Sequence, residues 1–422
     1  MPVYGKISRR TVLGIGAAAT ASLAIPARAH AASSTTGSGV QGLRAARVFD
    51  GERLHADPSL VLLCGGTIIG VLPEGSDTGR IPVTDLGDVT LMPGLVDAHV
   101  HLCFEPTGDI TTPSLEDSDE TMLERIRLNA RAALSSGVTT VRDVADRGYL
   151  TLGVRDERAA DMPEILCSGP PITTPDGHCW FLGGVAESDD EIVAAVDERA
   201  ARGVDVVKVM ATGGTLTAGS NPFEAQYTVE QLRLLVDRAH RHRLPVTAHA
   251  HGAPGIAAAV QAGVDGVEHA TFLSPTGVTV DEETIMAMAA AQIFVGSTAA
   301  QVPEGTASEL VLAVAAVLAS EYRAGVPMVC SSDAGASPEK PFTCMPYGVV
   351  QMRDYLGMTD QAALRSATSL AADSCGVGNR KGRIRPGYDA DLLAVPGNPA
   401  ADVMAMLNPV TIYRAGRLIP SS

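Results

Sequence analysis

Two histidines with one residue between them stand at the end of an early apolar segment. His99 and His101 follow the segment MPGLVDA, which favours a strand at residues 94–101. Residues i and i+2 of a strand point to the same side, so these imidazoles could together hold one divalent cation. An H-x-H pair also arises by chance. Its position at the end of a predicted strand favours the metal-binding interpretation.

Further histidines follow two later apolar segments. His249 ends a predicted strand at residues 245–249, and His269 ends the segment VDGVE. One such histidine would more often be a core residue, but two at successive strand ends favour ligands of a second cation. His251 lies two residues after His249, so it either shares that side of the strand or already belongs to the loop.

A lysine occupies the middle of an otherwise uncharged strand. Lys208 lies in the segment VVKVM, where burial would disfavour its ammonium form. It could lie at a wet edge or pair with an acid. Alternatively, its neutral amine could be carboxylated by carbon dioxide, which would create an anionic ligand with two oxygens that can bridge two metals.

An acid follows a late uncharged segment. Asp333 comes after MVCSS and either caps the following segment or faces the same cavity. Beside a cation it would stay ionised, hold the metal and accept a proton from a bound water.

Repeated helix-to-strand transitions predict the elements that position these residues. Glycines at 137, 203, 263 and 325 each follow a helical pattern and precede a strand, with about 60 residues between successive glycines, twice the length of a strand-plus-helix unit. Intervening strands are predicted at residues 94–101, 163–168, 245–249 and 292–296. Eight parallel strands predict an α/β fold, a (β/α)8 TIM barrel at residues 93–382. An open doubly wound sheet is the alternative, although no glycine-rich dinucleotide motif supports it.

Segments on either side of the barrel have short β patterns. Residues 41–92 and 383–422 contain strand-like runs separated by glycine and proline. We expect them to form one small composite β-sandwich domain.

The first residues have the pattern of an export signal. Residues 1–31 carry Lys6, Arg9, Arg10 and Arg28 but no acid, and an uncharged stretch precedes a small-residue cleavage site. The Arg pair resembles a twin-arginine signal, which predicts recognition by the twin-arginine export machinery, although an ordinary secretory signal is the alternative. Residues 32–40 then form a predicted linker. We expect an exported protein, periplasmic or extracellular, with no membrane anchor after signal removal.

Composition restricts the other function classes. The chain has 422 residues, 45% hydrophobic and only 4% aromatic, which favours a globular protein with an aliphatic core. An excess of 48 acids over 32 bases argues against nucleic acid as a partner. Seven dispersed cysteines without a C-x-x-C pair indicate neither a disulfide scaffold nor a thiolate zinc site. No G-x-S-x-G motif supports a serine hydrolase.

The order H-x-H, strand lysine, His, His, Asp resembles the binuclear amidohydrolase superfamily. The segments VKVMATGG, HAHG and GVEH are most similar to the branch with Xaa-Pro dipeptidase-like and lysine carboxypeptidase-like enzymes, ochratoxinase and imidazolonepropionase-like proteins. The resemblance implies that one metal is held by His99, His101 and Asp333, and the other by His249 and His269. It also implies that carboxylated Lys208 bridges them. Zinc is the expected metal because the ligands are nitrogen and oxygen.

The resemblance implies a metal-dependent hydrolase of an amide or peptide-like carbon–nitrogen bond, with Asp333 moving the proton. A dipeptide, an N-acyl amino acid or an ochratoxin-like amide is the expected small-molecule substrate. A cyclic amide, as for imidazolonepropionase-like enzymes, is one alternative, and a non-catalytic barrel that serves in assembly is another. A homo-oligomer stays open.

Loops after the predicted strands are expected to contact the substrate. We expect contacts from His178, Tyr227 and His251, with Trp180 beside His178 as an apolar wall. Tyr227 could instead be a packing residue, and His178 could instead stabilise its loop. Arg142 could hold a substrate carboxylate or form a buried pair with the adjacent Asp143.

Overall fold

The computed structural model describes residues 39–57, 59–303 and 305–420. The predicted signal peptide at residues 1–31 and all but the last two residues of the predicted linker lie outside the described residues. Within the described ranges, no helix is both long and apolar enough to cross a membrane.

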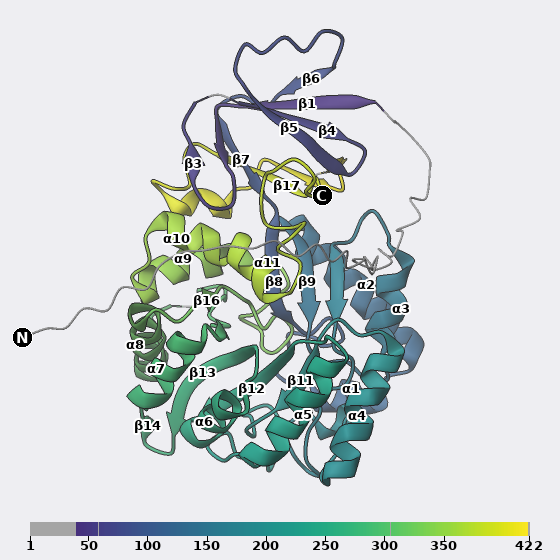
Figure 1. The fold of residues 1–422 in the computed structure, drawn as a ribbon, viewed down its shortest axis with the longest axis vertical. Helices are drawn as coiled ribbons and strands as arrows, with labels where there is room; N and C mark the ends of the chain where they lie inside the picture. Colours follow the sequence, from purple (N-terminus) through teal and green to yellow (C-terminus); the bar gives the residue numbers. More distant parts are fainter. Residues whose placement is uncertain (1–38, 58, 304, 421–422) are drawn as a thin grey trace, which may run out of the picture. The chain divides into compact units, whose positions relative to one another are not determined.

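Parallel strands alternate with helices through the middle of the chain (Figure 1). One parallel sheet has the order β10-β9-β8, and a second has the order β11-β12-β13-β15-β16 with the short β14 paired to β13. Isolated parallel bridges also join Val100 to Ala334 and Ile172 to Val209. The strands are β8 (Leu95–Val100), β9 (Val138–Asp143), β10 (Glu164–Cys167), β11 (Val207–Met210), β12 (Val246–Gly252), β13 (Gly266–Ser274), β14 (Gly277–Val278), β15 (Phe294–Gly296) and β16 (Met328–Val329). The arrangement confirms a TIM-barrel-like α/β fold.

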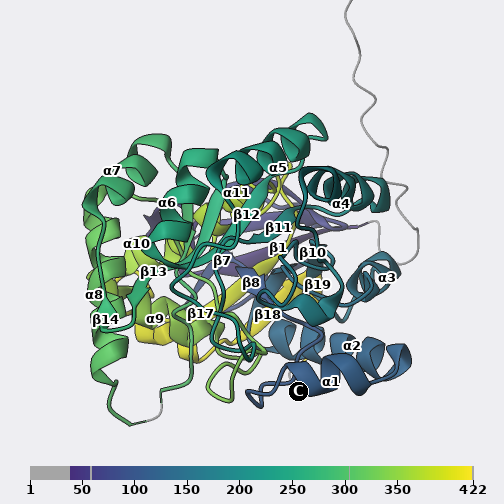
Figure 2. The same ribbon diagram turned by 90° about the horizontal axis from the view of Figure 1, so that it is seen from below.

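Helices lie outside these strands, as Figure 2 shows for α3 to α8. Their bounds are α1 (Thr111–Glu116), α2 (Asp119–Ser135), α3 (Leu150–Glu157), α4 (Asp189–Arg202), α5 (Val229–Arg241), α6 (Ala253–Ala262), α7 (Glu282–Ala291), α8 (Glu309–Ala324), α9 (Met345–Leu356), α10 (Asp360–Ser366) and α11 (Ser369–Ser374), with 3-10 turns η1 (Trp180–Leu182) and η2 (Val403–Leu407).

The predicted helix-to-strand transitions depend on left-handed glycines. Gly203, Gly263 and Gly325 cap α4, α6 and α8 with φ between 77° and 93°, a conformation that side chains with a Cβ adopt at a cost. Gly137 also has positive φ but follows one residue after the cap of α2 at Ser136. Each glycine lies between the end of a helix and the start of the next strand.

Residues from both ends of the chain form two further sheets. One has the order β5-β4-β1-β6, and the other has the order β19-β18-β17-β7-β2-β3. β7 pairs with β17 in antiparallel fashion, so the second sheet joins the two terminal segments. Their bounds are β1 (Val40–Ala45), β2 (Arg47–Phe49), β3 (Leu54–His55), β4 (Ser59–Cys64), β5 (Thr67–Pro73), β6 (Val83–Asp85), β7 (Val89–Pro93), β17 (Leu392–Pro396), β18 (Thr411–Arg414) and β19 (Arg417–Ile419). One buried cluster draws residues from both sheets, among them Leu43, Leu63, Leu91 and Leu392.

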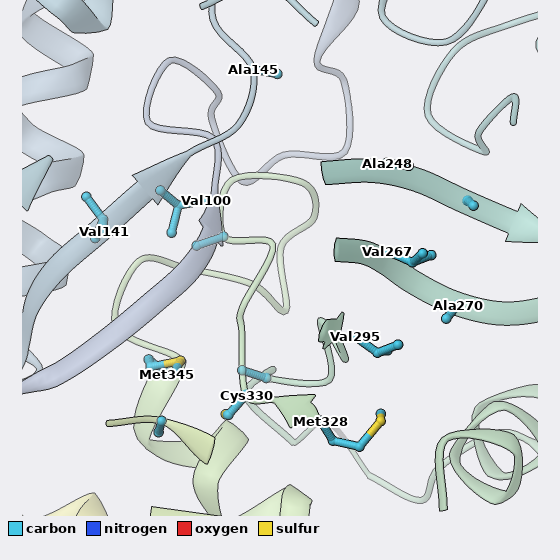
Figure 3. Close-up of a cluster of buried hydrophobic side chains, with 14 of the residues drawn as sticks. Val100, Val141, Ala145, Ala248, Val267, Ala270, Val295, Met328, Cys330 and Met345 are labelled. Carbon is cyan, nitrogen blue, oxygen red and sulfur yellow. The ribbon is translucent and has the colours of Figure 1, made fainter. Parts of the chain in front are cut away.

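The core is built from the small aliphatic side chains that the composition predicts. Val267 of β13 pairs with Val295 of β15, and both are fully buried (Figure 3). Their burial, with that of Ala248 and Met328, removes apolar surface from water at roughly 25 cal/mol per Å². This core fixes the positions of the strand ends that carry the polar residues.

A buried ion network joins the first parallel sheet to the C-terminal segment. The Lys381 ammonium is 1% exposed, contacts the Asp391 carboxylate, and lies 2.9 Å from Glu164 of β10 and 3.0 Å from Asp389. Arg380 also contacts Glu164. Burial tends to raise the pKa of Glu164, but Arg380 and Lys381 hold it well below its usual range. The network therefore stabilises the folded protein while Glu164 is ionised.

Candidate metal centre

Two histidines and an aspartate converge at the end of β8. The Nε2 atoms of His99 and His101 lie 3.2 Å apart, and Asp333 Oδ1 lies 3.4 Å from the first and 3.1 Å from the second. These three atoms are therefore close enough together to bind one ion.

Backbone pairing beyond the strands brings Asp333 to the histidine pair. The Asp333 amide donates to the His99 carbonyl at 2.8 Å, and the His101 amide donates to the Ala334 carbonyl at 3.0 Å. Asp333 has φ of 59°, a left-handed conformation that is uncommon outside glycine and typical of constrained functional sites. The residue after β16 is thus held beside β8, as the predicted barrel requires.

Three more histidines converge at the ends of β12 and β13. One nitrogen from each of His249, His251 and His269 lies within 4.8 Å of the others. His251 Nδ1 lies 2.8 Å from the Thr271 hydroxyl, and His269 Nδ1 lies 2.9 Å from the Thr298 hydroxyl. These bonds leave Nε2 of both rings free for a ligand. The structure thus places His251 on β12 rather than in the loop.

An irregularity in β13 aims His269. The pairing of β12 with β13 shifts register between Ala250 and Gly252, and His269, Ala270 and Phe272 all have positive φ. Such conformations cost of order 1–3 kcal/mol each and persist only where the surroundings enforce them. His269 and Thr271 both line the same cavity.

Lys208 lies in the same cavity, on β11. Its side chain is 1% exposed, and its Nζ has no hydrogen-bond partner among the described residues. Burial lowers the pKa of Lys208 to about 8, although the nearby Glu268 and Asp333 carboxylates act in the opposite direction. An unpaired ammonium in this position is costly, so the amine is suited to modification or to a ligand.

A buried glutamate that was not predicted from the sequence contacts His99, one of the three residues at the end of β8. Glu268 Oε2 lies 2.8 Å from His99 Nδ1, and Oε1 accepts from Arg142 at 3.0 Å and from Thr247 at 2.6 Å. Gly296 provides the necessary space, because a Cβ there would lie 2.0 Å from Oε2. The signal in the sequence was the acid directly before His269 in a buried strand.

Arg142 does not form a buried pair with Asp143, which was one of the two alternatives for this residue. Neighbouring residues of a strand point to opposite faces, and the Arg142 guanidinium bonds Glu268 and the carbonyls of Ala98 and Ser374. Asp143 instead accepts from the Leu102 amide at 2.7 Å.

Burial favours the neutral form of five imidazoles that line the cavity. Burial lowers the pKa of His99 and of His251 to about 4 and the pKa of His178 to about 3. It also lowers the pKa values of His249 and His269 well below their usual range. Burial acts to raise the pKa of Asp333, but the hydrogen bond to His101 and the charge of the Lys340 ammonium hold that pKa below its usual range. Neutral imidazoles and an ionised carboxylate are the forms that bind metal.

The residues fit divalent metal ions. Two ligands of a tetrahedral zinc, each about 2.1 Å from the ion, lie roughly 3.4 Å apart, which matches the spacing among His99, His101 and Asp333. The bond from His99 Nδ1 to Glu268 is the carboxylate support that metal-bound histidines usually have. Lys208 Nζ supplies an unpaired buried atom in the same cavity.

Both groups open into one cavity of about 310 Å³. His178 lines it, with Nδ1 2.8 Å from the Thr217 hydroxyl and its ring 4.6 Å from that of His249. Trp180 does not line the cavity. It is 38% exposed and its ring packs against Phe181, because the 3-10 turn directs the side chain outward. The prediction that Trp180 forms an apolar wall of the site is therefore wrong.

Tyr227 also lies away from this cavity. Its ring belongs to the hydrophobic core, and its hydroxyl donates to the Ala186 carbonyl at 2.6 Å. The expected substrate contact is therefore wrong, and the packing role is observed. The adjacent Gln226 does support the site, because its amide oxygen accepts from the His178 backbone and its amide nitrogen donates to the Met210 carbonyl at the end of β11.

Comparison with known proteins identifies the family. The model of the amidohydrolase family matches residues 90–419. The chain belongs to the amidohydrolase family. This amidohydrolase is 27% identical to ochratoxinase of Aspergillus niger over 385 residues, which cover 82% of this chain and 78% of that protein. It is 26% identical to imidazolonepropionase of Deinococcus deserti, with 86% and 93% covered.

Among solved structures, the amidohydrolase resembles an Xaa-Pro dipeptidase with methionine bound in its active site. The TM-score is 0.80 at 26% identity, and the match covers 90% of this chain and all of the other. These findings confirm the predicted superfamily and the predicted enzyme class, a hydrolase that acts on carbon–nitrogen bonds.

Proposed function

We propose that this amidohydrolase uses two divalent metal ions to hydrolyse an amide or peptide-like bond in a small molecule. The observation that carries the proposal is the convergence of two histidine-containing groups and an unpartnered buried lysine on one cavity. The similarity to ochratoxinase and to an Xaa-Pro dipeptidase supports the same bond type.

His99, His101 and Asp333 would hold one ion, and His249 and His269 the other. Lys208, carboxylated on Nζ, would bridge them, because a carbamate supplies two oxygens where the free amine has no partner. Zinc is the expected metal, given nitrogen and oxygen ligands. When bound, the two ions lower the pKa of water and polarise the amide carbonyl.

Residues of the chain perform the remaining tasks. Asp333 would accept a proton from the attacking water and return it to the leaving nitrogen, and its depressed pKa keeps it ionised for the first step. Glu268 keeps the His99 ring in place through Nδ1. His178 and His251 line the cavity beside His249 and would orient the substrate.

The expected substrates are a dipeptide, an N-acyl amino acid or an ochratoxin-like amide. A second candidate is a cyclic amide, which the similarity to imidazolonepropionase favours. Activity confined to cyclic amides would support the second candidate. A protein without bound metal and without turnover would instead favour a non-catalytic barrel.

Three finer features belong to the same proposal. The parallel strands would form a closed barrel, since isolated bridges join both pairs of sheet edges. The terminal sheets would form a β-sandwich around their shared buried cluster. Residues 1–31 would direct export to the periplasm or beyond through the twin-arginine machinery, and their sequence pattern supports this.

Replacement of Lys208 by alanine tests the proposal. We expect Lys208→Ala to lose both metal content and turnover of a panel of dipeptides, N-acyl amino acids and cyclic amides. Propionate can enter the space that the lysine leaves and supply two carboxylate oxygens, so we expect it to restore part of both. A Lys208→Ala protein with full metal content and full turnover would refute the bridging role.

A further inference from the structure

The cavity has an aliphatic wall made by one face of α8. The wall consists of Leu310, Val311, Val314, Ala315 and Leu318. Their spacing of one, three and four residues places them on a single stripe of the helix. Leu310 is 51% exposed, whereas Leu318 is only 3% exposed. The stripe therefore runs from the protein surface into the cavity.

This wall lies beside the second histidine group. α8 packs against β13, the strand that carries His269 and Thr271. Leu273, also on β13, lines the cavity together with Leu356. An apolar surface is thus continuous with the place where the reacting bond would lie.

Charged partners for a substrate are scarce on this side. Among the described residues that line the cavity, Lys208 and Lys340 are the cationic ones. The Lys340 ammonium donates to the carbonyls of Thr298 at 2.6 Å and of Ser332 at 2.8 Å, so backbone oxygens already occupy it. A charged substrate group against α8 would be buried without a partner, which is costly.

We propose that the α8 wall determines specificity, and that it binds an uncharged aliphatic chain carried by the amide substrate. This proposal rests on the proposed function, because it names the substrate class of the same site. A volume of about 310 Å³ is within the range of small-molecule sites and has room for such a chain. Amides whose only large group is charged would be poor substrates.

Binding of linear primary amides tests the wall without requiring turnover. Titration calorimetry would measure the affinity of the zinc-loaded protein for each member from butanamide to octanamide. We expect affinity to rise about fourfold for each added methylene, as burial of one CH₂ predicts.

A matched pair of variants shows whether α8 is responsible. Leu310 and Leu312 are both 51% exposed and lie on the same helix, but Leu310 lines the cavity and Leu312 does not. Leu310→Gln should weaken octanamide binding by about fivefold, since a half-exposed leucine can bury only part of its surface against a ligand. Leu310→Gln should weaken butanamide binding less than octanamide binding, and Leu312→Gln should change neither affinity.

The outcomes separate this inference from the proposed function. Affinity that does not depend on chain length, or equal losses in the two variants, would overturn the role of α8. Zinc-loaded protein that binds octanamide as expected but hydrolyses no amide would instead reject the proposed function. Hydrolysis of amides without any preference for longer chains would reject the α8 inference alone.

Discussion

Replacing Glu268 by glutamine should change which nitrogen of His99 is free to bind a metal. Glu268 Oε1 accepts hydrogen bonds from Arg142 and Thr247, so the oxygen of a glutamine is required at that position. Its NH₂ group then faces His99 Nδ1, which must accept rather than donate. The proton of His99 moves to Nε2, the atom that lies beside His101 and Asp333.

The expected losses follow from these contacts. Loss of a carboxylate behind a metal-bound histidine typically costs 10- to 100-fold in metal affinity, or about 1.4 to 2.8 kcal/mol. Glu268 is 1% exposed, and removing one partner of a buried ion pair costs about 3 to 5 kcal/mol. We expect the free energy of unfolding to fall by about 3 kcal/mol, the lower end of this range, because Arg142 keeps its bonds to the Ala98 and Ser374 carbonyls.

Zinc titration of the metal-free protein and urea unfolding measure the two effects. Glu321→Gln is the matched control, because Glu321 is also a buried glutamate but has no hydrogen-bond partner among the described residues. Burial raises the pKa of Glu321 well above its usual value, so its contribution to stability falls as pH rises above that usual value. Glu321→Gln should therefore keep its metal affinity and be as stable as, or more stable than, the unmodified chain at neutral pH. Wild-type zinc affinity in Glu268→Gln would refute the predicted move of the His99 proton to Nε2.

Three further predictions concern a glycine, the buried ion network and two histidines. Gly296→Ala should lower the free energy of unfolding by about 1 to 3 kcal/mol and weaken metal binding, because the added Cβ would collide with Glu268. The control is Gly153→Ala in α3, where a Cβ has open space, and urea unfolding should show it to be neutral or slightly stabilising. Lys381→Met should lower the free energy of unfolding by about 3 to 5 kcal/mol at neutral pH. Because the pKa of Glu164 is depressed, this loss should shrink as pH falls through the acid range. A loss that does not depend on pH would contradict the stabilising role of the network. Elemental analysis should show that His249→Asn has lost a metal ion and that His251→Asn has kept both ions. In a turnover assay, His251→Asn should have a kcat/KM about 10²-fold lower. Metal loss in His251→Asn would show that His251 is a ligand.

Residue type and strand period were sufficient to predict that most residues of the candidate metal centre lie close together. Parallel strands present their carboxyl ends at the same edge, so His99, His249, His269 and Asp333 could be placed in one cavity from the alternation of elements alone. Lys208 was recognisable because a lone ammonium in an apolar strand needs an explanation.

Contacts across strands and the paths of loops could not be predicted in the same way. Glu268 reaches His99 from a strand 169 residues away, and no local pattern records that partner. Tyr227 lies in an irregular segment and Trp180 in a short 3-10 turn, and the direction of these side chains depends on packing rather than on a period of two. The α8 wall depends on which face of an apolar helix meets the cavity, and an apolar pattern alone does not specify this.

Carbon-13 NMR of the zinc-loaded protein, prepared with ¹³C-labelled bicarbonate, tests the metal-bridging role of Lys208 most directly. The proposed centre predicts a protein-bound carbamate signal that is absent from Lys208→Ala prepared in the same way. Two bound zinc ions in a protein without any carbamate signal would contradict it.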